Sequence, residues 1–236
     1  MEDYIEGNMQ QTIDNVNYKF IPHKVNNIEK TIKVKKTMEN DIYEKYEATA
    51  IVDGELIICK DASSMKQRVK KIVRENYEMY MQTLEQRDPK KDQWIYNILD
   101  GISEQESVLY RDDKCVVFLN YFWDGKDVDK LQLLCMPTDK NLRTIRSLDF
   151  WSLPLLKHMR KVTLDLIQEK YGLEQGDIKM YFHYEPSTYH LHIHFVNTAS
   201  AHLHSSVEYS HELNNVMFNL KMMSDYYKIA LLNIRV

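Results

Sequence analysis

Polar residues dominate the first part of the chain, and strand-like and helix-like hydrophobic patterns alternate after it. Residues 1–39 are hydrophobically sparse, so we expect a mobile arm that holds no more than one ordered strand. Between Tyr43 and Lys60, β-branched and aromatic residues lie on both sides of Asp53-Gly54, a dipeptide that favours a tight turn. We therefore predict a β-hairpin in this segment.

The next segment carries apolar residues near helical spacing on a charged surface. We predict a helix that is capped by Ser63 or Ser64 and runs to about Leu84. The stretch Arg87-Asp88-Pro89 then marks a break. The hairpin and the helix together form a predicted N-terminal domain at residues 40–87.

Beyond the break, residues 88–236 predict an antiparallel sheet with packed helices. Strands are expected at 107–111, 116–120, 131–136, 178–184, 189–196 and 229–234, and helices at 152–171 and 207–223. The run from Leu131 to Met136 is nearly all apolar, as in a strand that is covered on both faces. The first helix should end at Gly172 and bury one stripe, formed by Leu155, Leu156, Met159, Val162 and Leu166. The fold class predicted is α+β.

Composition narrows the class of protein. The chain has 236 residues, with 31 basic against 35 acidic side chains and a net charge of -4, which argues against broad binding to duplex DNA. No run approaches the ~18–20 apolar residues of a membrane span, and Met1-Glu2-Asp3 does not begin a secretory signal. We expect a cytoplasmic protein that contacts no membrane, with a nuclear share left open.

Cysteine spacing points to no stabilising cross-link. Cys59, Cys115 and Cys135 are odd in number and far apart, with no Cys-x-x-Cys pair. The sequence therefore predicts neither a disulfide framework nor a thiolate zinc site.

Histidine is concentrated in one region of the chain. Seven of the nine histidines fall between His183 and His211. Three of them, His190, His192 and His194, alternate with apolar residues, and side chains of a strand alternate between its two faces. We expect three imidazoles to project from one face while their apolar neighbours enter the core.

Two kinds of chemistry fit a row of imidazoles. Imidazole is the commonest zinc ligand, so the row could hold a metal. A neutral imidazole can also attack phosphorus while its neighbours orient it and offset phosphate charge. No Cys, Asp or Glu lies at short metal-ligand spacing from the row, which favours phosphate chemistry without a metal. The plain alternative is three surface histidines on a half-exposed strand.

The segment Tyr189-His190-Leu191-His192-Ile193-His194-Phe195-Val196 matches the histidine-triad signature, in which three histidines alternate with apolar residues. Four further stretches, at 40–43, 93–100, 145–156 and 181–190, resemble one branch of that superfamily, the scavenger mRNA decapping enzymes. The resemblance extends from about residue 40 to the C-terminus.

The resemblance implies hydrolysis of the 7-methylguanosine cap dinucleotide, or of short capped RNA, to 7-methylguanosine monophosphate and a nucleoside diphosphate end. It implies no cofactor. The resemblance also implies a homodimer whose N-terminal parts exchange strands and close over the active site.

Residue roles follow from the same resemblance. His192 would be the nucleophile and form a covalent nucleotidyl-histidine, while His190 and His194 would fix its tautomer and stabilise phosphate charge. His183 and Ser187 would contact the phosphates. If the nucleophile must be neutral, activity should fall as the pH drops through about 6.5, the ordinary histidine pKa.

Substrate-binding residues are implied as well. Trp94 would stack on the positively charged methylguanine, and Glu104 would accept hydrogen bonds from its edge. Asn40 and Tyr43 match positions that close over the substrate, and Arg68 aligns loosely with a lysine that faces the phosphates.

The chain departs from the family pattern at four positions. Asn120 and Phe122 stand where the family has an acid and a lysine, Thr188 replaces a usual tyrosine, and Tyr209 replaces an arginine. Lost cations weaken the binding of anions. Two alternatives therefore stay open, a cap-binding or regulatory protein with little turnover and a dinucleoside polyphosphate hydrolase that does not require the methyl group.

Overall fold

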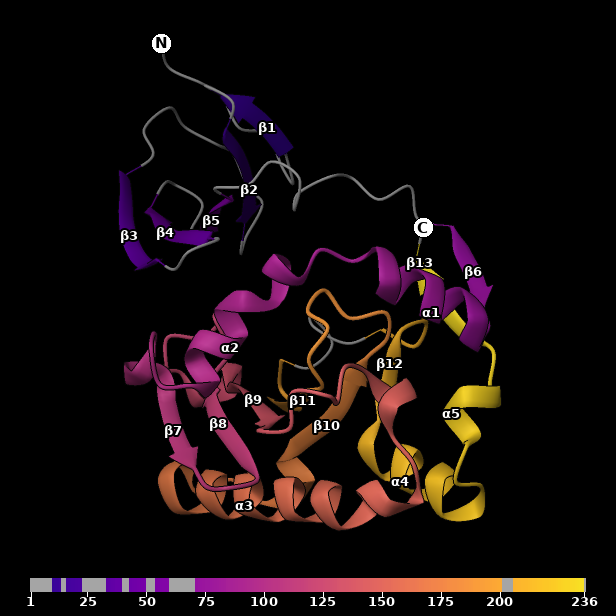
Figure 1. The fold of residues 1–236 in the computed structure, drawn as a ribbon. Coiled ribbons are helices and arrows are strands. Elements are labelled where there is room, and N and C mark those ends of the chain that lie inside the picture. The colour runs from indigo at the N-terminus through magenta and orange to yellow at the C-terminus, as the bar shows by residue number, and fades with distance from the viewer. Residues whose placement is uncertain are drawn as a thin grey trace. The chain divides into compact units, whose positions relative to one another are not determined.

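The chain divides into two compact units, Met1–Arg68 and Val69–Val236 (Figure 1). The computed structural model describes five strands before residue 60, and then residues 71–200 and 206–235. The expected domain boundary after residue 87 thus differs from the boundary that the structure draws at Arg68.

The first unit contains one five-stranded antiparallel sheet. Its strands are β1 (Gln10–Ile13), β2 (Val16–Pro22), β3 (Lys33–Glu39), β4 (Tyr43–Thr49) and β5 (Gly54–Cys59), in the order β1-β2-β5-β4-β3. The predicted hairpin is confirmed, since β4 pairs with β5 from Tyr43 opposite Cys59 to Ala48 opposite Gly54. Three strands precede residue 40, so the expectation of at most one strand there is wrong.

The second unit begins with a strand where a helix was predicted. β6 (Ile72–Glu75) pairs antiparallel with β13 (Leu232–Arg235), and this long-range pairing takes residues 72–75 out of the helix. Helix α1 (Tyr77–Gln86) begins only after Asn76, whose side chain accepts a hydrogen bond from the N–H of Met79 at 2.9 Å. The caps predicted at Ser63 and Ser64 lie outside the described residues.

A six-stranded antiparallel sheet forms the body of the second unit. Its strands are β7 (Val108–Arg111), β8 (Cys115–Leu119), β9 (Gln132–Pro137), β10 (Ile178–His183), β11 (Ile193–Asn197) and β12 (Ser210–Glu212), in the order β12-β10-β11-β9-β8-β7. Every residue of β9 is buried, which confirms that this strand is covered on both faces.

Two helices cover opposite faces of this sheet. Alternate residues of β8 point to opposite faces of the sheet. Cys115 and Val117 belong to the core cluster that contains residues of α3 (Leu153–Tyr171). Val116 and Phe118 belong to the cluster that contains residues of α2 (Gln93–Leu99). We call these the α3 face and the α2 face.

The long helix α3 begins and ends as predicted, with Gly172 at its C-cap in a left-handed conformation (φ 70°). Its fully buried stripe is Leu153, Leu156, Met159, Thr163 and Ile167. The predicted residues Leu155, Val162 and Leu166 are only partly buried at the edge of that stripe.

The C-terminal elements begin later than predicted. Ser210–Glu212 is the strand β12 because His211 pairs with Phe182 of β10, so α4 (Leu213–Met222) starts at Leu213. Helix α5 (Tyr226–Ile229) ends at the first residue of the predicted last strand, and the strand β13 begins at Leu232. α4 lies beside α3 (Figure 1). No helix among the described residues is long and apolar enough to cross a membrane.

Short 3-10 turns complete the unit. They are η1 (Pro89–Asp92), η2 (Gln105–Ser107), η3 (Val128–Lys130), η4 (Ile145–Ser147), η5 (Phe150–Ser152) and η6 (Gln175–Asp177).

Candidate active site

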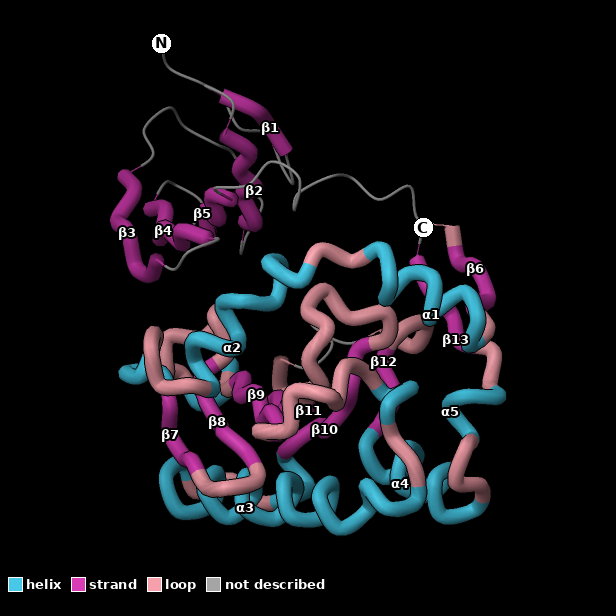
Figure 2. The backbone as a smooth tube through the Cα atoms, viewed as in Figure 1, coloured by secondary structure: helices cyan, strands magenta, loops and turns pink. Residues whose placement is uncertain are grey.

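The histidine row lies where a loop enters β11. The chain between β10 and β11 is loop (Figure 2), so only His194 of the three lies within the strand. The strand predicted from Tyr189 is too long at its start, because the backbone N–H of Leu191 donates to the carbonyl oxygen of Leu142 instead of to a neighbouring strand.

The predicted alternation of faces is confirmed. Leu191, Ile193 and Phe195 belong to the core cluster on the α3 face. His194 pairs across the sheet with Leu134, a residue of the α2 cluster. The rings of His190 and of Tyr96 on α2 meet edge to face, with centroids 5.8 Å apart. The histidines therefore share the α2 face.

All three histidines are buried. The exposed fraction is 0% for His190 and 9% for both His192 and His194. The half-exposed surface strand considered as an alternative is therefore wrong.

A backbone hydrogen bond fixes the tautomer of His192. Its Nδ1 lies 2.8 Å from the carbonyl oxygen of His190, and a carbonyl can only accept, so Nδ1 carries the proton. The lone pair of the neutral ring is then on Nε2. Burial lowers the pKa of His192, although the bond to His190 and the charge of Asp92 act in the opposite direction.

His190 is held in the same way. Its Nε2 lies 2.7 Å from the carbonyl oxygen of Pro137, the last residue of β9. Burial lowers the pKa of His190 to about 4, so its ring is neutral at physiological pH.

A group of aromatic rings surrounds His194. Its ring stacks on Tyr181 with centroids 5.1 Å apart, and it lies 4.3 Å from His183 and 5.0 Å from His192. The ring of Tyr209 also contacts His183, with centroids 4.6 Å apart. The structure thus brings His183 to the row, as the sequence predicted, and puts a ring at the position of the missing arginine.

An arginine that the sequence analysis did not single out joins the site. Arg143 lines one small pocket together with His183, His190 and His192. Its Nη1 donates to the hydroxyl of Tyr96 and, at 3.3 Å, to the carbonyl oxygen of Tyr189.

The remaining predicted residues fall into different surroundings. Trp94 is half-buried on α2 and packs against its core cluster, whereas Ser187 is exposed in the loop before the histidine row. Asn120 is buried, and its Oδ1 accepts from the N–H of Phe122, so its side chain closes a turn. Among the described residues, Glu104 is the non-glycine residue with a left-handed backbone (φ 51°).

Two of the positions that depart from the family pattern, Thr188 and Phe122, differ in exposure. Thr188 is buried and Phe122 is 44% exposed. Tyr43 begins β4, but its side chain, like all of Asn40 and Arg68, lies outside the described residues.

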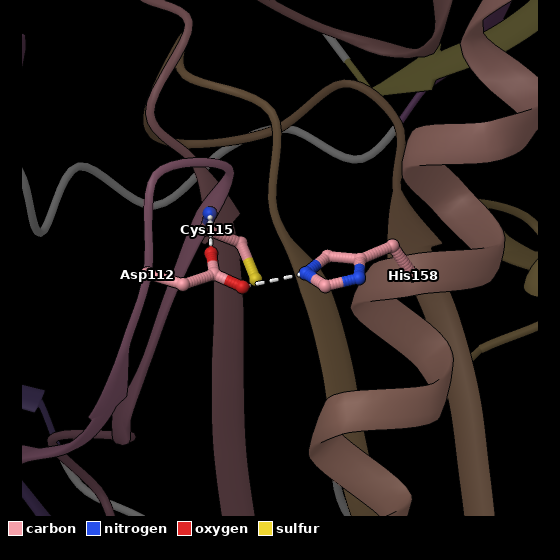
Figure 3. A group of neighbouring side chains, drawn as sticks. All are labelled: Asp112, Cys115 and His158. Carbon is pink, nitrogen blue, oxygen red and sulfur yellow. Dashed lines mark hydrogen bonds and ion pairs between the residues drawn. The ribbon is translucent and has the colours of Figure 1, made fainter.

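A second polar group lies on the α3 face (Figure 3). Nε2 of His158 is 2.6 Å from Oδ2 of Asp112, and the thiol of Cys115 lies within 4.8 Å of both. These are ligand types that zinc accepts. Both oxygens of Asp112 are already used, because Oδ1 accepts from the N–H groups of Lys114 and Cys115 and Oδ2 also accepts from the hydroxyl of Tyr110.

These hydrogen bonds also stabilise the ionised form of Asp112. Burial acts to raise the pKa of Asp112, but its hydrogen bonds outweigh burial and the pKa is lowered. The carboxylate is therefore satisfied by hydrogen bonds within the protein, and the group joins the β7–β8 turn to α3.

Comparisons with known proteins identify the family of the chain. The family model described as "Scavenger mRNA decapping enzyme C-term binding" matches residues 93–209. The m7GpppX diphosphatase of Ascaris suum is 33% identical over 210 residues, which are 83% of this chain and 70% of that protein. The Caenorhabditis elegans m7GpppX diphosphatase is 31% identical over 84% of this chain and 68% of that protein. The human m7GpppX diphosphatase is 31% identical over 58% of this chain and 42% of that protein.

A solved structure described as "Hnt3 in complex with DNA and guanosine" is similar at a TM-score of 0.40 and 21% identity, over 58% of this chain and 81% of that one.

A buried histidine row at the start of a strand, in an antiparallel sheet with helices on both faces, defines a histidine-triad domain of the α+β class. Within that class, the chain belongs to the scavenger mRNA decapping enzyme family.

Proposed function

We propose that this protein is a hydrolase that cleaves the pyrophosphate linkage of the 7-methylguanosine cap, in the cap dinucleotide or in short capped RNA. Its relatives named m7GpppX diphosphatase support this activity. The observation that carries the proposal is the bond from His192 Nδ1 to the carbonyl oxygen of His190, because it leaves Nε2 as a lone-pair nucleophile.

The reaction proceeds in two displacements. Nε2 of His192 attacks the phosphorus next to the methylated nucleoside, a P–N bond forms, and the P–O bond to the next phosphate breaks. A nucleoside diphosphate end leaves with the displaced electron pair. Water then attacks the same phosphorus and loses a proton, the P–N bond breaks, and 7-methylguanosine monophosphate is released with His192 restored.

Other side chains stabilise charge in this scheme. Arg143 and His183 line the pocket beside His192, so they face a phosphate that His192 attacks. Arg143 in particular supplies a cation in a site where Phe122 and Tyr209 replace the charged residues of the family. His194 supports the ring of His192 at 5.0 Å, and Ser187 donates its hydroxyl to the phosphates.

The methylated base binds to α2 and the turn after it. Trp94 stacks on the cationic ring, and Glu104 accepts from the guanine edge. The left-handed backbone of Glu104 supports a binding role, since strained residues of this kind collect at ligand sites. We also propose Asn40, Tyr43 and Arg68 as substrate-binding residues, as the family resemblance implies.

The test is hydrolysis of methylated and unmethylated cap dinucleotide by the purified protein, with a chelator present. We expect 7-methylguanosine monophosphate from the methylated substrate and none from a His192→Asn variant that still binds the cap. His158→Asn is the matched control, since His158 lies on the α3 face, and it should hydrolyse like the wild type.

Three results would contradict the proposal. Turnover by His192→Asn would remove the nucleophile assignment, and equal cleavage of both substrates would favour a dinucleoside polyphosphate hydrolase. Cap binding without any product would favour a cap-binding protein.

We further propose a homodimer in the cytoplasm. A mass near twice 28.2 kDa by light scattering is the expected result. A monomeric mass at micromolar concentration would exclude the dimer.

A further inference from the structure

A buried ion pair joins the end of α1 to the start of α2. The guanidinium of Arg87 binds the carboxylate of Asp92 with two parallel hydrogen bonds, Nε to Oδ2 at 3.0 Å and Nη2 to Oδ1 at 2.8 Å. The side chain of Asp92 is 2% exposed and that of Arg87 is 17% exposed. A bidentate pair in this setting has a fixed geometry.

The same two side chains bind the loop that leads to the histidine row. Oδ1 of Asp92 accepts from the backbone N–H of Tyr189 at 3.0 Å, and Nη2 of Arg87 donates to the carbonyl oxygen of Ser187 at 2.8 Å. The guanidinium carbon of Arg87 also lies 4.1 Å from the centre of the Tyr189 ring. Three interactions therefore hold residues 187–189, directly before His190.

These contacts connect the two halves of the site. Asp92 immediately precedes α2, and Trp94 lies two residues further on. Tyr189 immediately precedes His190. A shift of Asp92 would change the position of the histidine row relative to the helix that carries Trp94.

We propose that Asp92, held by Arg87, is a positioning residue that sets the distance between the base-binding helix and the nucleophilic histidine. This inference rests on the proposed function, since it assigns the two ends of one substrate to Trp94 and His192. Neither Asp92 nor Arg87 touches the reacting atoms in this role.

The charge of Asp92 gives the proposal a second, electrostatic consequence. The titratable and charged groups around His192 are His183, His190, His194, Arg143 and Asp92. Asp92 raises the pKa of His192 against the lowering by burial. Removing the Asp92 charge should therefore lower the pKa of His192 further.

The experiment compares Asp92→Asn with the double variant Arg87→Met/Asp92→Asn. The double variant leaves no unpaired buried charge, so it should fold even if the single variant does not. For the methylated cap dinucleotide we expect kcat to fall about tenfold to a hundredfold, with KM within about twofold of the wild type. The pKa of His192, followed by NMR titration, should decrease in Asp92→Asn, which removes the carboxylate charge alone.

Asp100→Asn is the matched control. Asp100 follows α2 at its other end and pairs with Lys140 at 2.7 Å on the surface, so its loss should change neither kcat nor the pKa of His192. A folded double variant with wild-type kcat overturns the inference. A wild-type protein that hydrolyses nothing overturns the proposed function instead.

Discussion

Arg146 and Glu75 form an ion pair inside the second unit, with Nε of Arg146 3.1 Å from Oε2 of Glu75 and the side chains 0% and 1% exposed. The hydroxyl of Tyr184 donates to the same carboxylate, and Arg146 Nη1 donates to the carbonyl oxygen of Tyr227 at 2.6 Å. The pair thus ties β6, η4, α5 and the end of β10 to one another.

Arg146→Met should destabilise the protein by about 3–5 kcal/mol, because it leaves the Glu75 carboxylate buried without its cation. Urea unfolding measures the free energy, and the double variant Glu75→Gln/Arg146→Met should recover part of the loss. Lys161→Met, which breaks the exposed pair with Asp165 on α3, is the control and should change stability by no more than about 0.5 kcal/mol. An equal loss in both single variants would show that burial of the pair is unimportant.

The stability loss in Arg146→Met should depend on pH. Burial already raises the pKa of Glu75, and losing Arg146 removes an influence that lowers it. A carboxyl whose pKa is raised in the folded state binds a proton more tightly there than in the unfolded chain, so lowering the pH favours folding. We therefore expect the destabilisation to be smaller at pH 5 than at pH 7.5, and a larger loss at pH 5 would contradict this account.

Local patterns predicted those parts of the fold that local interactions determine. The apolar run of β9 and the Gly172 cap of α3 are confirmed, because burial on both faces and a left-handed cap leave a direct trace in sequence. The strand β6 was missed since Ile72–Glu75 becomes a strand only by pairing with Leu232–Arg235, at the far end of the chain. A window of neighbouring residues contains no signal for such a partner.

In the candidate site, too, the local sequence pattern was predictive and the contacts between distant residues were missed. The spacing of His190, His192 and His194 predicted one shared face, and the structure confirms it. Arg143 and Asp92 were missed because a single Arg or Asp in a polar segment looks like an ordinary surface charge. Only the folded chain shows that both contact the loop before His190.

Activity should persist further into acid than an ordinary histidine nucleophile would allow. Burial lowers the pKa of His192, and a lower pKa means that the neutral, nucleophilic ring persists to lower pH. The midpoint of the acid limb of kcat/KM should therefore lie below about 6.5, which corrects the value expected from sequence. Circular dichroism at each pH serves as the control for folding, and a midpoint at or above 6.5 with the protein folded would refute this.

Glu104→Gln should weaken cap binding selectively. An ionised acceptor in a hydrogen bond contributes about 1.5–3 kcal/mol, so affinity for 7-methylguanosine monophosphate should fall by about tenfold to a hundredfold. Titration of intrinsic Trp fluorescence measures this affinity. Glu106→Gln is the matched control, because Glu106 is an exposed carboxylate in the same turn. Equal affinities for both variants would remove Glu104 from the base site.

Arg143 should be the cation on which turnover depends most. It lines the pocket with His192, and its Nη1 is oriented by the Tyr96 hydroxyl and the carbonyl oxygen of Tyr189. Arg143→Gln should lower kcat/KM for the methylated cap dinucleotide by about a hundredfold to a thousandfold, as the loss of one donor to developing phosphate charge does elsewhere.

Arg143→Lys should lose less than Arg143→Gln, because lysine keeps the charge but lacks the planar fork. Arg160→Gln is the control, since Arg160 on α3 binds Asn214 at 2.7 Å and should leave kcat/KM unchanged. Wild-type kcat/KM in Arg143→Gln would mean that phosphate charge is stabilised by the histidines alone. A loss of equal size in Arg143→Lys and Arg143→Gln would assign the effect to the bidentate geometry of Arg143 and not to its charge.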